Sequence, residues 1–225
     1  MADPLQNGVV STWQGSANER PRRPLPFSGM PDLPGDPDPA DRIAAAHATA
    51  AALLQAGRVT DDSDPERTRR LVALADNVGI DEIAELWCDS GTDTLPGTLW
   101  SLYLLRTWVH RDGVEASRLF AAGHLVAEVS SAVAGVAEPP GPREVAALGD
   151  AVLTSAFDGD FAIALERAAA FCRVVAAGRA HLADDSEDGS PDGESSRQTR
   201  LAQGNLRMAE ELERSAELWR AGELT

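Results

Sequence analysis

Apolar residues recur every three or four positions over most of residues 40–182, which is the spacing of one face of an α-helix. Val145, Leu148 and Val152, for example, fall on one side of a single predicted helix. No segment shows the strict alternation of apolar and polar residues that is typical of a half-buried strand. The pattern therefore predicts an all-α fold.

Helix-start and helix-end signals divide this region into separate elements. Pro39 and Gly57 bracket the first, and Ser63 with Glu66 three residues later forms a capping box for the second. Within the core we expect helices at 39–57, 63–79, 81–88, 95–111 (capped by Thr94), 113–136 (capped by Asp112), 141–157 and 159–182. Short connections favour antiparallel neighbours, so we expect an irregular antiparallel bundle of about six to eight helices.

Two segments outside the helical domain of residues 40–182 have the composition of disordered chain. Residues 1–39 are rich in Pro, Gly and Asp, and residues 183–196 form an acidic, low-complexity stretch. We expect a disordered N-terminal tail and a flexible acidic linker. Trp13 stands out in the tail as an aromatic residue that a partner protein could bind.

An amphipathic helix is predicted in the C-terminal segment, residues 197–225, with its helical part at 197–221. Leu201, Met208, Leu212 and Trp219 fall on one face of it. This apolar face needs a surface to cover it, and the sequence allows three alternatives. The helix docks back on the core, which is the default, pairs with a second copy to form a homo-oligomer, or binds a protein partner.

The charge balance narrows the classes of partner. The chain has 36 acidic and 20 basic residues, a net charge of −16, which disfavours direct binding to nucleic acid. All the basic residues are arginines, so chemistry that needs a lysine is excluded. No apolar run reaches the roughly 20 residues of a membrane span, and no signal peptide is apparent at the N-terminus. We therefore expect a cytoplasmic protein without membrane contact.

Residues 99–112, LWSLYLLRTWVHRD, place Arg106 in an apolar helix between Tyr103 and His110. A buried arginine needs a partner, so the first interpretation is a salt bridge in the core. The sequence does not decide which carboxylate pairs with Arg106; the candidates are Glu128, Asp150 and Glu166. The alternative is a ligand site in which Arg106, Tyr103 and His110 bind a small anion.

The search for catalytic and metal-binding motifs is negative. The HRD tripeptide at 110–112 lacks the remaining protein-kinase motifs, and its aspartate is better explained as a helix cap. His124 and Glu128 stand one turn apart but have no further ligands beside them. Cys88 and Cys172 lie in separate helical patterns without a CxxC motif. We expect no catalytic residue, no metal site and no cofactor.

Two stretches, ELWCDS…LPGTLWSLYLLRTWVHRD and AEPPGP…FDGDFAIALERAAAFCRVVAAGRA, together resemble a group of small, acidic, all-helical cytoplasmic proteins of actinobacteria. The resemblance covers about the second half of the core and neither tail. It implies the fold class and no activity, cofactor or residue role.

Three functions remain as hypotheses. The first is a non-enzymatic adaptor or regulatory protein that acts through protein–protein contacts, with Trp13 and the C-terminal face as candidate contact residues. The second is a domain that binds a small anion through Arg106. The third is association of the acidic surface with a basic protein, such as part of the transcription machinery.

Overall fold

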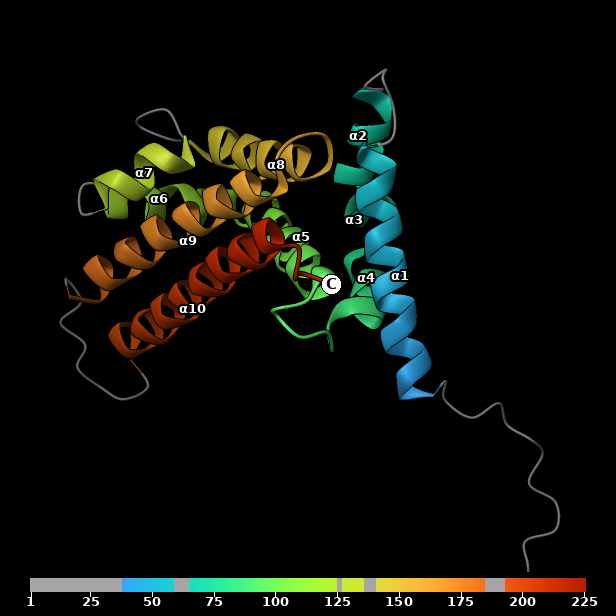
Figure 1. Ribbon diagram of the computed structural model, residues 1–225. Coiled ribbons are helices and arrows are strands. Elements are labelled where there is room, and N and C mark those ends of the chain that lie inside the picture. The colour runs from blue at the N-terminus through green and yellow to red at the C-terminus, as the bar shows by residue number, and fades with distance from the viewer. Residues whose placement is uncertain (1–37, 59–64, 125–126, 136–140, 185–192) are drawn as a thin grey trace, which may run out of the picture. The chain divides into compact units, whose positions relative to one another are not determined.

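The computed structural model of the chain describes residues 38–58, 65–124, 127–135, 141–184 and 193–225 (Figure 1). Ten helices and no strand form in these ranges, so the predicted all-α fold is confirmed for the part described. The helices are α1 (Pro39–Arg58), α2 (Pro65–Val72), α3 (Leu74–Asn77), α4 (Ile80–Trp87), α5 (Leu95–Arg111), α6 (Gly113–His124), α7 (Glu128–Ala134), α8 (Pro142–Asp158), α9 (Phe161–Asp184) and α10 (Glu194–Ala221). None of the described helices is both long and apolar enough to cross a membrane.

The number of helices exceeds the eight expected because two predicted helices are each divided. The segment at 63–79 forms α2 and α3, and the segment at 113–136 forms α6 and α7. In both segments the three-to-four spacing of apolar residues continues across the division, so the sequence pattern does not reveal it. The proposed cap Ser63 and most of the predicted tail and linker fall outside the described residues.

Helix α9 is buried on nearly every side, and α6, α7, α8 and α10 all pack against it. Two glycines set its distance from α6. A Cβ atom on Gly178 would collide with the carbonyl of Leu119 in α6, and a Cβ atom on Gly123 would collide with the carbonyl of Val174 in α9. The two backbones therefore touch, which only residues without a side chain permit.

Helix α5 is the second buried element, and α1, α4, α6, α8 and α10 pack around it. As predicted, Thr94 caps its start: the hydroxyl accepts a hydrogen bond from the Gly97 amide at 3.3 Å. At its other end, Asp112 links α5 to α6 through its carbonyl, which accepts from Ala116 at 2.9 Å. The Asp112 carboxylate accepts from Arg111, so here the main chain of the predicted cap residue makes the bond to α6.

Helix α10 lies alongside α9, as Figure 1 shows in red and orange, so the C-terminal helix docks on its own chain. Two ion pairs join the helices to each other: Arg173 to Glu213 at 2.6 Å and Glu166 to Arg220 at 2.6 Å. The main-chain oxygen of Thr225 also accepts a hydrogen bond from Leu95 at the start of α5.

The face of α10 that contacts the core includes most of the predicted stripe and, beside it, residues that were not predicted. Its buried residues include three alanines at seven-residue spacing, Ala202, Ala209 and Ala216. Of the predicted stripe, Leu212 is buried, Met208 and Trp219 are half-buried against the core, and Leu201 is exposed. The predicted face was chosen from large apolar residues and left out the alanines. Small side chains such as alanine let two helices approach closely, so they can form the contact surface.

Candidate functional site

Arg106 is paired within the protein. The residue is 5% exposed, and its guanidinium makes three hydrogen bonds to carboxylates of other helices. Nη1 and Nη2 donate to the two oxygens of Asp76 at 3.0 and 2.8 Å, and Nε donates to Asp150 at 2.7 Å. His110 Nε2 lies 2.9 Å from the same Asp150 oxygen. We call these four residues the Arg106 cluster.

The electrostatics of the cluster follow from these bonds. The hydrogen bond from Arg106 holds the pKa of Asp76 below its usual value, although partial burial acts in the opposite direction. Burial alone would lower the pKa of Arg106, but the bonds to Asp76 and Asp150 outweigh it and the pKa is raised. The cation is therefore neutralised by two carboxylates, which leaves no free charge to attract an anionic ligand.

The three residues predicted to bind an anion are only partly brought together. Arg106 and His110 meet at Asp150, whereas the Tyr103 hydroxyl donates to the carbonyl of Leu71 at 2.6 Å. Burial raises the pKa of Tyr103 well above its ordinary value. The guanidinium thus faces carboxylates rather than a cavity, and this geometry corresponds to the core salt bridge.

Of the carboxylates considered as partners of Arg106, Asp150 is the one that the structure pairs with it. Glu166 pairs with Arg220 instead, and the side chain of Glu128 lies outside the described part of the molecule. The second partner, Asp76, was missed by the sequence analysis.

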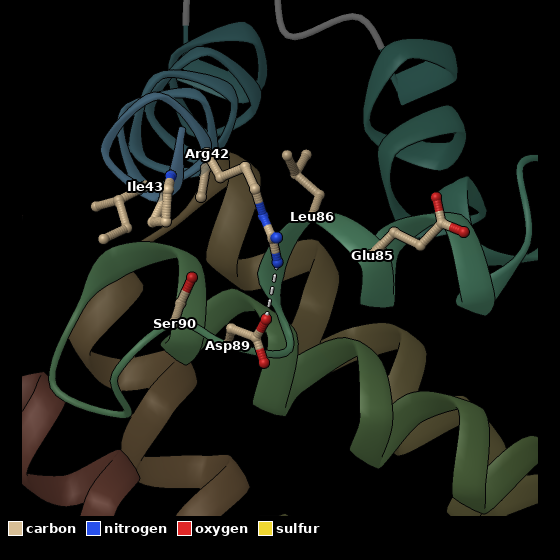
Figure 2. A pocket seen from close by; sticks show the side chains of 8 residues that line it. Arg42, Ile43, Glu85, Leu86, Asp89 and Ser90 are labelled. Atoms are coloured by element: carbon tan, nitrogen blue, oxygen red, sulfur yellow. Dashed lines mark hydrogen bonds and ion pairs between the residues drawn. The ribbon is translucent and has the colours of Figure 1, made fainter. Parts of the chain in front are cut away.

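A different feature, an open groove between α1 and the α3–α4 segment, has the form of a binding site. It consists of two neighbouring hollows that share Leu86. The first, with a volume of about 330 Å³, lies at the start of α1. Figure 2 shows Arg42 reaching across from α1 to Asp89, 3.1 Å away, with Ile43 on the α1 side and Leu86 beside the pair. We call the two hollows together the α1–α4 groove.

The second hollow is larger and apolar, with a volume of about 500 Å³. Its lining comes from α1, from α3 with the turn after it, and from α4, and includes Leu53, Leu74, Val78, Ile83, Leu86 and Trp87. Trp87 of α4 lines this hollow and connects that helix to α1. Its indole Nε1 donates to the Thr49 hydroxyl at 3.2 Å, and that hydroxyl donates to the Ala45 carbonyl at 2.8 Å.

Large apolar side chains are exposed along the groove. Ile43 is 61% exposed, Val78 50% and Leu86 36%. They are three of the eight large hydrophobic residues that the described part of the chain exposes, and they line the same depression. Exposed apolar residues that gather in one depression mark an interaction site more often than scattered ones do.

Acidic side chains of α4 border the groove. Glu82 lines the second hollow and Glu85 the first, and both are exposed. Among the described residues no basic side chain forms an ion pair with either of them. In Figure 2 Glu85 points away from the pair formed by Arg42 and Asp89. The rim of the groove therefore carries two uncompensated negative charges.

No group of three or more potential metal ligands occurs in the described ranges. Cys88 is exposed, whereas Cys172 is fully buried, and burial raises the pKa of its thiol to about 12. A thiol with that pKa stays protonated and is a poor nucleophile near neutral pH.

Comparison of the chain with protein-family models, with curated proteins and with solved structures gives no match. The resemblance to actinobacterial proteins therefore stays a prediction.

The α1–α4 groove was not predicted from the sequence. Helical spacing of apolar residues predicts a buried core, and Leu86 and Val78 belong to that spacing. The signal that could have revealed the groove is the number of apolar residues on the short segment 74–87, which is more than one face can bury. The other candidate contact residue, Trp13, lies outside the described residues.

Proposed function

We propose that this chain is a non-enzymatic helical adaptor or regulatory protein of the cytoplasm, and that it binds a segment of a partner protein in the α1–α4 groove. The observation that carries the proposal is the apolar hollow of about 500 Å³ between α1 and α4, which is open to solvent and bordered by exposed Val78 and Leu86.

The groove suits a protein partner for energetic reasons. Burying one large apolar side chain in it contributes roughly 1.5–3 kcal/mol, and the hollow has room for at least one such anchor. A protein interface commonly depends on a few anchors of this kind. The small-anion hypothesis has less support, because Arg106 already bonds to Asp76 and Asp150.

An affinity capture from the organism that encodes the chain tests the proposal. Three baits are compared: the wild type, Leu86→Asn in the groove, and Leu206→Asn as a matched control. Leu206 is 40% exposed, close to the 36% of Leu86, but it lies on α10. We expect a specific partner that the wild type and Leu206→Asn retain and that Leu86→Asn loses.

Point variants are preferable here to deletion of the C-terminal helix. Removing residues 197–225 would expose the face of α9 that α10 covers. Any change in the proteins captured could then result from disruption of the fold and not from loss of a binding site. A partner list that is the same for all three baits would contradict a role for the groove.

A further inference from the structure

We infer that the segment bound in the α1–α4 groove is an amphipathic helix of the partner protein with basic residues beside its apolar face. This inference rests on the proposed function, and it adds the chemistry of the partner. Three observations carry it: the groove walls are helices, their surface is apolar, and the acids on the rim lack basic partners.

The secondary structure of the bound segment follows from the walls. Both sides of the groove are helices, whose backbone amides and carbonyls already bond within the helix. They offer no free edge to which an extended peptide could add as a strand. A segment that enters an apolar groove must then satisfy its own backbone groups, and a helix does this.

The length of the segment follows from the length of the groove. Its lining on α1 runs from Pro39 to Ala56, which at a rise of about 1.5 Å per residue spans about 25 Å. A partner helix of about 17 residues covers that distance. Its apolar residues would repeat at three and four positions, so that one side chain enters the large hollow and another contacts Ile43 and Leu86.

The charge of the segment follows from the rim. Glu82 and Glu85 are exposed without a basic partner in the described part of the chain, and the whole chain carries a net charge of −16. Lysine or arginine beside the apolar face of the partner helix would complement these carboxylates and speed association. Acidic residues there would be repelled.

The same charges argue against a second copy of this chain as the occupant. A symmetric dimer through the groove would bring Glu82 and Glu85 of one copy toward those of the other. Like charges at an interface are costly, and the strong negative charge of each copy adds to the repulsion.

Peptide titration tests the inference. The first probe is a fluorescein-labelled synthetic helix of about 17 residues with leucines on one face and lysines on the other; the second replaces every lysine by glutamate. Fluorescence polarisation with the full-length protein at about 0.1 M salt measures both affinities. We expect the lysine peptide to bind at least about tenfold more tightly than the glutamate peptide.

Two pairs of variants separate specific binding from adsorption to an acidic surface. Leu86→Asn should weaken binding of the lysine peptide about tenfold, whereas Leu206→Asn should leave it unchanged. The double variant Glu82→Gln/Glu85→Gln should weaken binding severalfold. Its control, Glu210→Gln/Glu217→Gln, removes the same charge from exposed positions on α10 and should have a smaller effect. Circular dichroism of each variant confirms that it is folded.

The outcomes that overturn the inference are distinct. Equal loss of affinity in both glutamine variants together with no effect of Leu86→Asn would mean adsorption by net charge. A concentration-dependent dimer that Leu86→Asn abolishes would identify a second copy as the occupant. If affinity capture depends on Leu86 but neither peptide binds, the proposed function stands and the inferred partner chemistry is wrong. If capture is independent of Leu86, the proposed function fails as well.

Discussion

Replacing Arg106 by methionine tests the central claim about the core, that the Arg106 cluster stabilises the packing of three helical segments. Methionine keeps an unbranched apolar stem close to the Arg106 side chain in length, which matters because Gly149 packs against the Arg106 Cα and Cγ atoms. The substitution therefore removes the charge and three hydrogen bonds while retaining much of the packing.

The expected cost follows from burial on both sides of the pair. Breaking a fully buried pair from one side costs about 3–5 kcal/mol, because the remaining charge is stranded. Here the side chain of Asp76 is 57% exposed and that of Asp150 is 40% exposed, so water can hydrate both carboxylates after the arginine is lost. We discount the cost by about half and expect Arg106→Met to lower the free energy of unfolding by about 2 kcal/mol.

Urea denaturation at pH 7 measures this difference. A loss of about 2 kcal/mol lowers the midpoint by about 1 M for a protein of this size. Arg111→Met is the matched control, since it removes an arginine five residues further along α5 whose ion pair with Asp112 is at the surface. That control should change the free energy of unfolding by less than about 0.5 kcal/mol. An Arg106→Met midpoint equal to or above that of the wild type would refute the structural role of the cluster.

The pH dependence of stability gives an independent check. The pKa of Asp76 is lowered in the folded protein from an ordinary value of 3.8, mainly by the hydrogen bond from Arg106. A lowered carboxyl pKa means that its stabilisation is complete above the unfolded value and is lost as the pH falls through the folded value. The stability difference between the wild type and Asp76→Asn should therefore narrow below about pH 4. A difference that stays constant there would contradict the assignment.

Three further substitutions test the packing and a buried hydrogen bond. Gly178→Ala should destabilise the protein by about 1–3 kcal/mol or more, since a Cβ atom there collides with the Leu119 carbonyl. Gly204→Ala should stabilise the protein by about 0.5–1 kcal/mol, because a Cβ atom at that position meets no other atom. Thermal melts compare the two, and equal effects would argue against the close helix crossing. Tyr103→Phe should cost about 1–3 kcal/mol, because it leaves the buried Leu71 carbonyl without its donor; an unchanged urea midpoint would show that the bond contributes nothing.

The sequence predicts the local features of this fold well. Thr94 as a helix cap, the buried helix containing Arg106 and the need of Arg106 for a carboxylate partner follow from spacing, capping chemistry and the cost of an unpaired charge. The structure selects Asp150 from the three acids that the sequence left open. Asp76 could not be predicted in this way. It belongs to a four-residue helix whose direction depends on tertiary packing, and the sequence pattern joins that helix to its neighbour.

The groove is harder to predict for a different reason. A residue such as Leu86 has the same sequence signature whether another helix covers it or it faces solvent. Helical spacing shows which residues share one face of a helix, but it does not show what packs against that face. Similarly, alanines such as Ala209 are weak hydrophobic signals, although they form much of the surface by which α10 meets α9. Both errors concern tertiary packing, which the spacing of apolar residues along one helix does not record.

The enclosure of α9 by four other helices has a consequence for how the molecule opens. Amide hydrogens of α9 should exchange with deuterium only through global unfolding, whereas α1 and α4, each with one side facing the groove, should exchange through smaller local openings. A ligand that occupies the groove would slow exchange in α1 and α4. It would leave α9 almost unchanged, because the amides of α9 are already protected nearly to the limit set by global unfolding. The slowly exchanging amides of α9 thus serve as an internal reference against which binding at the α1–α4 groove can be measured.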